Sequence, residues 1–173
     1  MEYLNIATHI ILIMSLGWYL ITNLQWYNYK LDRVVFKHHK WQWHLTYFLS
    51  PIVLFYLIPE PYFSAYFFII YLTSFVLWNR KLTNPLVLTA RVKRFLAILL
   101  VLTFIVIGIC LMYEDCMNKI IFIPLILTYI ISTILEKLLF ISFKNRAKQR
   151  HRSIVGLRTV AITASFGKTS IKN

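Results

Sequence analysis

Long apolar stretches constrain the fold of this chain more than any other feature. Hydrophobic residues make up 59% of its 173 positions and aromatic residues 17%, and it has only 4 glycines and 5 prolines. Such a composition is typical neither of a soluble domain nor of a disordered segment. In lipid, every backbone polar group must be bonded within the protein, so a stretch of roughly 20 apolar residues crosses as a helix. The sequence therefore predicts an all-α membrane protein.

Five stretches are long enough to be transmembrane helices. The second and third are near the lower limit of ~17 residues, and Pro59-Glu60-Pro61 leaves room only for a tight turn between them. We therefore expect these two to form a helical hairpin. In the last stretch, Glu136-Lys137 is expected to mark the inner headgroup layer. Residues 1–150 form the predicted multi-pass domain, with spans at about 3–24, 44–60, 62–78, 95–113 and 120–143.

The loop charges predict the orientation of these helices. Lysine and arginine are retained on the cytoplasmic side of a membrane, and here they alternate sharply between the two sets of loops. The expected outer loops contain Glu2, Glu60, Glu114 and Asp115, with Lys119 as their one cation. We therefore expect the N-terminus outside and the C-terminus in the cytoplasm. The expected inner segments contain Lys30, Arg33, Lys37, Lys40, Arg80, Lys81, Arg91, Lys93, Arg94, Lys144, Arg146, Lys148, Arg150 and Arg152.

The net charge of +13 raises the question of nucleic-acid binding. Of the 19 lysines and arginines, 17 lie in the expected inner segments, and eight of these follow residue 143. The two exceptions are Lys119 and Lys137. Anionic lipid headgroups attract such clusters beside membrane spans at about 1 kcal/mol per charge. We therefore expect membrane lipids, and not nucleic acid, to be the partner of these charges.

A few polar residues within or beside the spans invite functional hypotheses. His9 lies inside the first span, near its outer end, where it either has a function or simply reaches the headgroups. The histidines between His38 and His44 are expected to belong to a solvated basic loop, because metal binding would need further donors. Cys110 and Cys116 are close enough for a disulfide on the oxidising side, although nothing else in the sequence supports one. The spans contain too few ionisable groups to favour a transporter.

A different pattern follows the last span. Residues 157–163 have the β-branched content of a buried parallel strand, and they lead directly into Gly167-Lys168-Thr169. In a phosphate-binding loop, glycine lets backbone N–H groups approach phosphate, lysine contacts the β- and γ-phosphates, and the hydroxyl ligates Mg²⁺. The full P-loop template also has a glycine at the position of Ile162, so the template is only half met.

Residues 160–172 resemble the ATP-binding loop of the Mur ligase family, whose usual form is Ile-Thr-Gly-x-x-Gly-Lys-Thr-[Ser/Thr]. Ala164 occupies a position where that family has glycine. The closest likeness is to the MurF-type branch, which adds D-alanyl-D-alanine to UDP-N-acetylmuramoyl-tripeptide. Some members of that branch have a multi-pass membrane segment before the ligase domains, and residues 24–30 are similar to part of such a segment.

The resemblance implies that residues 151–173 begin a cytoplasmic, Mur-ligase-type α/β ATP-binding domain that is truncated here, after its first strand and P-loop. ATP and Mg²⁺ would be its cofactors, and Thr169 would ligate the metal. A nucleotide-sugar peptide and a dipeptide would be bound by domains beyond residue 173, so this fragment alone is expected to be inactive. The location implied is the bacterial inner membrane. The expected nucleotide-binding residues are Ala164, Ser165, Phe166, Gly167, Lys168, Thr169 and Ser170.

Two alternatives remain open. The chain could belong to another membrane-tethered ligase of the same superfamily, such as a polyglutamate-type enzyme. It could also be a small integral membrane protein without enzymatic activity, in which Gly167-Lys168-Thr169 arises by chance. The sequence after Asn173 distinguishes these possibilities, because a ligase needs several hundred further residues.

The loop charges generate a direct test of orientation. A reporter fused after Arg152 should be active only in the cytoplasm, and one inserted near Glu114 only outside, because the cationic loops are retained on the inner side. Activity of both reporters on the same side of the membrane would contradict the five-span prediction.

Overall fold

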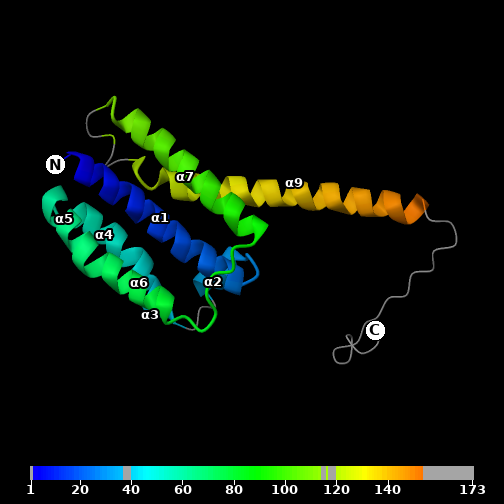
Figure 1. The fold of residues 1–173 in the computed structure, drawn as a ribbon, viewed down its shortest axis with the longest axis horizontal. Coiled ribbons are helices and arrows are strands. Elements are labelled where there is room, and N and C mark those ends of the chain that lie inside the picture. Colours follow the sequence, from blue (N-terminus) through cyan, green and yellow to red (C-terminus); the bar gives the residue numbers. More distant parts are fainter. Residues whose placement is uncertain (1, 37–39, 114–115, 117–119, 154–173) are drawn as a thin grey trace. The chain divides into compact units, whose positions relative to one another are not determined.

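The computed structural model describes residues 2–36, 40–113, 116 and 120–153, and every regular element in these ranges is a helix (Figure 1). The chain divides into two compact units, Met1–Ile134 and Leu135–Asn173. The first unit contains α1 (Glu2–Trp26), α2 (Leu31–Phe36), α3 (Trp41–His44), the π-helical turn η1 (Leu45–Leu49), α4 (Ser50–Leu57), α5 (Glu60–Tyr66), the π-helical turn η2 (Phe67–Tyr71), α6 (Leu72–Arg80) and α7 (Ala90–Cys110). The remaining helix, α9 (Ile123–Ser153), begins in the first unit and continues into the second.

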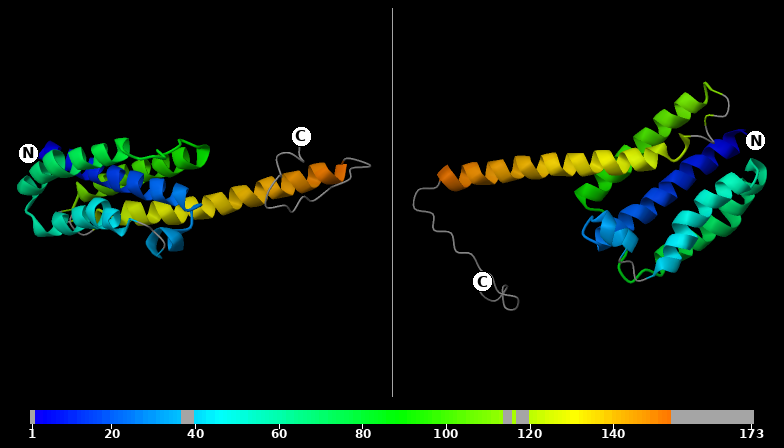
Figure 2. Two further views of the ribbon diagram at one scale, coloured as in Figure 1. Left: turned by 90° about the horizontal axis from the view of Figure 1, so that it is seen from below. Right: turned by 180° about the vertical axis from the view of Figure 1, so that it is seen from behind.

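Helix α1 is the centre of the first unit. It contacts α2, η1, α5, η2 and α7, and it lies between α7 and the hairpin formed by residues 41–80 (Figures 1 and 2). In its most apolar window 56% of the positions are buried, against 33% in each of the other two helices of this unit that qualify as spans. The buried side chains of α1 include Leu12, Ile13, Leu16 and Tyr19. The other helices therefore pack around α1.

Three prolines shape the hairpin. Pro51 lies in the first turn of α4, and Pro59 and Pro61 bracket the start of α5, where the missing N–H groups cost little. Pro51 cannot donate to the carbonyl of Tyr47, four residues earlier, and the helix adopts the π-helical turn η1 around that carbonyl. The Tyr71 hydroxyl, from η2 on the other arm, donates to the Tyr47 carbonyl oxygen at 3.0 Å. This bond joins the two arms of the hairpin through a carbonyl that Pro51 cannot bond.

Close packing of α7 on α1 depends on a glycine. A Cβ atom at Gly17 would overlap the side chain of Leu99, which is fully buried in α7. Small residues at such positions let two helices approach closely within a membrane. Helix α7 begins after Thr89, whose side chain accepts a hydrogen bond from the Val92 N–H at 3.4 Å and caps the helix.

Four described helical segments are long and apolar enough to cross a membrane, by length and composition: Leu4–Trp26, Glu60–Arg80, Ala90–Cys110 and Ile123–His151. They correspond to four of the five predicted spans, and the predicted hairpin turn at Pro59 is confirmed. The stretch predicted at 44–60 is helical over residues 41–57, about 17 residues, at the lower limit for a span.

Two helices extend beyond the stretches predicted as spans. Helix α7 begins at Ala90, five positions before the apolar stretch, because the Thr89 cap and not hydrophobicity sets its start. Helix α9 continues past residue 143 to Ser153, because straight-chain Lys, Arg and Gln residues favour helix as well as apolar residues do. The strand and phosphate loop predicted after residue 153 lie outside the described residues.

In the second unit, residues 135–153 of α9 are largely exposed. Apolar side chains such as Leu138, Phe140 and Phe143 lie in the first part and cationic ones in the last part. The Arg146 guanidinium lies 5.8 Å from the centroid of the Phe143 ring, within the range of a cation–π contact.

The contact between α1 and α7 generates a prediction about stability. Replacing Gly17 by leucine should lower the free energy of unfolding by about 1–3 kcal/mol, because the new side chain would overlap Leu99. Gly108→Leu is the matched control, since a Cβ at Gly108 meets no atom within 4 Å. Thermal unfolding of both variants in detergent measures the difference, and equal melting temperatures would show that α1 and α7 do not pack closely.

Candidate functional site

The predicted nucleotide-binding residues, Ala164 to Ser170, lie outside the described residues, as does the predicted Mg²⁺ ligand Thr169. Their roles therefore stay predictions. The structure does describe the two ends of the first unit, in which the helices pack together. These ends differ in charge and in the residues that hold them together.

One end, which we call the acidic end, contains the start of α1 and the turn before α5. The Asn5 side-chain amide donates to the Glu60 carboxylate at 2.8 Å, and the Thr8 hydroxyl donates to the Ser64 hydroxyl at 3.2 Å. His9 is only 3% exposed, its Nδ1 lies 2.6 Å from the Asn5 carbonyl oxygen, and its ring packs edge-on against Phe55. His9 therefore packs inside the bundle and does not reach for the headgroups.

The opposite end, which we call the basic end, joins the last turn of α1 and the turn that follows it to the loop before α7 and the first turn of α7. The Gln25 side chain bonds both the N–H and the carbonyl of Val87, at 2.9 Å each, and the Trp26 indole N–H donates to the Asn84 carbonyl at 3.0 Å. The Arg91 guanidinium lies 3.6 Å from the centroid of the Tyr29 ring. These contacts bring two cationic segments to the same end. They contain Lys30, Arg33 and Lys40 between α1 and α3, Arg80 and Lys81 at the end of α6, and Arg91, Lys93 and Arg94 in the first turns of α7.

Tyr29 itself has a strained backbone. Asn28 and Tyr29 have φ values of 54° and 58°, in the left-handed region. Asparagine tolerates this conformation, but a bulky residue adopts it only where its surroundings hold it there. The Arg91 contact fixes the Tyr29 ring, so the turn after α1 and the start of α7 are coupled.

A histidine bridge lies just inside the basic end. The Tyr19 hydroxyl and His44 Nδ1 are 2.6 Å apart, and His44 Nε2 lies 2.9 Å from the Val34 carbonyl oxygen. The bridge joins α1, α2 and α3 through one imidazole ring. His44 is half-buried, so the expectation of a solvated basic loop was wrong at this residue. Its proximity to Tyr19 depends on tertiary contacts among α1, α2 and α3, for which the sequence has no local signal.

An apolar cavity of about 270 Å³ lies against this bridge. Its walls come from α1, α2, α3 and η1. Both ring nitrogens of His44 are engaged in bonds that join helices, so the arrangement fits a structural clamp and not an acid–base pair. The lining side chains include Tyr19, Leu20, Val34, Trp41, His44 and Phe48.

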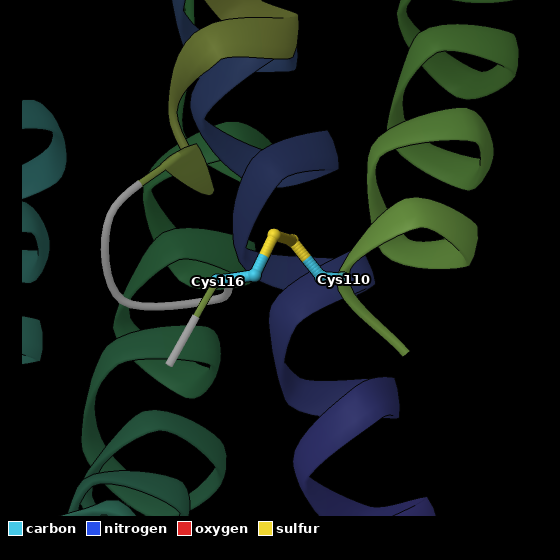
Figure 3. Close-up of a disulfide and its surroundings, with 2 residues drawn as sticks. All are labelled: Cys110 and Cys116. Carbon is cyan, nitrogen blue, oxygen red and sulfur yellow. A yellow bond between two sulfur atoms is a disulfide. The ribbon is translucent and has the colours of Figure 1, made fainter. Parts of the chain in front are cut away.

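The remaining metal- and thiol-type residues do not form a catalytic cluster within the described ranges. No group of three or more His, Cys, Asp or Glu side chains there could hold a metal ion. Cys110, the last residue of α7, forms a disulfide with Cys116, with their Cα atoms 4.9 Å apart (Figure 3). Helix α7 runs away from the basic end, so the disulfide lies at the acidic end.

The histidine bridge can be tested by removing one hydroxyl group. Tyr19→Phe should lower the free energy of unfolding by about 0.5–1.5 kcal/mol, because the hydrogen bond between the buried Tyr19 hydroxyl and half-buried His44 would be lost. Tyr62→Phe is the matched control, because that tyrosine is 71% exposed. Melting temperatures in detergent report the effect, and an unchanged value for Tyr19→Phe would show that the bridge does not stabilise the fold.

Comparison with protein-family models, with curated proteins and with solved structures finds no match to this chain. The candidate function is therefore argued from the residues and their geometry.

Proposed function

We propose that residues 1–150 anchor an ATP-dependent amide ligase of the Mur type in the bacterial cytoplasmic membrane, and that residues 151–173 begin its ATP-binding domain. The proposed reaction joins D-alanyl-D-alanine to UDP-N-acetylmuramoyl-tripeptide. The carboxylate of the tripeptide would first take the γ-phosphoryl group of ATP, which releases ADP and gives an acyl phosphate. The dipeptide amine then attacks the acyl carbon, phosphate leaves, and an amide bond forms.

The observation that carries this proposal is the sequence of the loop. Gly167, Lys168 and Thr169 follow a β-branched run, as in a strand that leads into a phosphate-binding turn. In the proposed site Lys168 holds the β- and γ-phosphates, Thr169 ligates Mg²⁺, and backbone N–H groups between Ala164 and Gly167 supply further donors.

The organisation of the helical unit supports placing this loop in the cytoplasm. The described loop cations gather at one end, which the positive-inside rule assigns to the cytoplasm. The Cys110–Cys116 disulfide lies at the other end, and disulfides persist on the oxidising side of a membrane. Helix α9 starts near the acidic end, where Phe122 packs on Phe55, and Tyr129 lies beside Arg91 at the basic end.

The internal polar groups support an anchoring role over transport. Thr8 bonds Ser64, Ser15 bonds Tyr71 at 3.4 Å, and Trp18 bonds Asn79 at 3.1 Å, so these polar side chains join α1 to the hairpin. Transport pathways instead place ionisable residues along a water-filled cavity. We infer that the helices hold the ligase at the membrane and take no part in its chemistry.

The nucleotide site generates a prediction for the longer protein encoded with these residues. Lys168→Ala should abolish ATP-dependent ligation and leave membrane insertion unchanged, because the loop follows the last helix. Lys172→Ala is the matched control, since that lysine lies outside the Gly-Lys-Thr motif and should retain activity. The assay measures amide product and ADP with the purified protein.

This assay, the sequence after Asn173 and a shortened protein together distinguish the alternative functions. Unchanged ligation in Lys168→Ala would show that the motif has been misread. Activity with glutamate in place of the dipeptide would favour a polyglutamate-type ligase. A stop codon directly after Asn173 would favour a small membrane protein without enzymatic activity.

A shortened protein tests the role of the helices. A protein that starts at residue 156 should ligate without binding membranes. If that protein folds and binds ATP but does not ligate, the helices take part in the reaction.

A further inference from the structure

The outer face of the hairpin contains an open groove that the proposed ligase does not use. It has a volume of about 490 Å³ and lies between α3–η1 on one arm and η2–α6 on the other. We call it the hairpin groove. Its lining residues include Trp43, Tyr47, Ile70, Ser74, Trp78 and Lys81.

The groove changes in chemistry along its length. Ile69 and Ile70, which are 72% and 59% exposed, line one part, and Lys81 lines the other. Twelve residues of helix separate Ile69 from Lys81, which corresponds to about 18 Å at 1.5 Å per residue. Half of a ~30 Å hydrocarbon core measures about 15 Å, so the groove matches the depth of one leaflet.

A second hollow continues the groove at the basic end. It has a volume of about 210 Å³, and Trp43 and Leu82 form walls of both hollows. Its other lining residues include Lys40, Thr83 and Asn84, and the Lys40 ammonium lies 4.2 Å from the centroid of the Trp43 ring. Two lysines and several polar groups therefore surround the headgroup end of an otherwise apolar groove.

The groove wall also contains a buried donor without an acceptor. Trp78 is 5% exposed, and its indole Nε1 has no hydrogen-bond partner among the described residues. Buried polar atoms are nearly always satisfied, and a tryptophan N–H can only donate. The Nε1 atom has almost no accessible surface, so this donor lies inside the groove wall and is not open to a ligand.

We propose that the hairpin groove binds one anionic phospholipid from the leaflet at the basic end. An acyl chain lies along Ile69, Ile70 and Leu77, which line the groove. The phosphate lies between Lys81 and Lys40, where charge complementarity selects an anionic over a zwitterionic headgroup. This inference does not depend on the ligase activity.

The test measures the lipid retained by the full chain. The protein is released from nanodiscs of equal phosphatidylglycerol and phosphatidylcholine, and bound lipid is counted by native mass spectrometry. We expect one phosphatidylglycerol per chain. Lys81→Ala should reduce its retention about fivefold, whereas Lys93→Ala, which removes an exposed charge from the same end but lines neither hollow, should not.

A second pair of variants tests the acyl chain. Ile70→Trp fills the groove and should reduce retention, while Val76→Trp adds the same bulk on an exposed part of α6 outside the groove and should not. Equal retention of the two lipids, equal losses in Lys81→Ala and Lys93→Ala, or full retention in Ile70→Trp would each overturn the proposal. Equal losses in the two lysine variants would indicate diffuse surface attraction.

Discussion

The burial of α1 is the constraint on which the rest of the described structure depends. In a membrane, apolar surface gives helices little reason to associate, because lipid is as apolar as leucine. Two different faces of helix α1 make the contacts that hold the other helices against it. Polar side chains on one face, such as Thr8, Ser15 and Tyr19, bond the hairpin, and Gly17 on another lets Leu99 of α7 approach closely. Hydrogen bonds and close packing therefore hold the helices together in lipid, where burial of apolar surface does not.

A second constraint, the need to satisfy every backbone group, explains the hairpin and its groove. Pro51 cannot donate to the Tyr47 carbonyl, and the Tyr71 hydroxyl on the other arm donates to it. That contact joins the arms at the level of the two π-helical turns. The hairpin groove lies along these same turns, so the contact that joins the two arms also shapes the groove. Polar contacts at both ends then keep the cationic loops together and apart from the disulfide.

Hydrophobic pattern was enough to locate the helices, because a long apolar stretch in lipid has few alternatives to helix. Pro59 and Pro61 located the turn for the same local reason, namely that proline cannot continue a helix. The local sequence pattern did not predict the surroundings of residues whose positions depend on tertiary contacts. His44 looked like part of a basic loop, yet it bridges Tyr19 and Val34. For His9 the sequence left open whether it has a function or reaches the headgroups, and in the structure it packs on Phe55. The start of α7 depended on the cap at Thr89, which hydropathy does not detect. The phosphate loop lies outside the described residues, so that part of the site rests on the sequence motif alone.

Cysteine cross-linking in native membranes tests most directly whether the face of α1 that contains Thr8 packs on the hairpin. The hydroxyl oxygens of Thr8 and Ser64 lie 3.2 Å apart, so cysteines at these two positions are within the geometry of a disulfide. With Cys110 and Cys116 replaced by serine, the pair Thr8→Cys and Ser64→Cys should cross-link rapidly under mild oxidation. The pair Thr8→Cys and Ala65→Cys, with the second residue exposed one position along α5, should not. Equal cross-linking of both pairs, or of neither, would contradict α1 as the fixed centre of the helical unit.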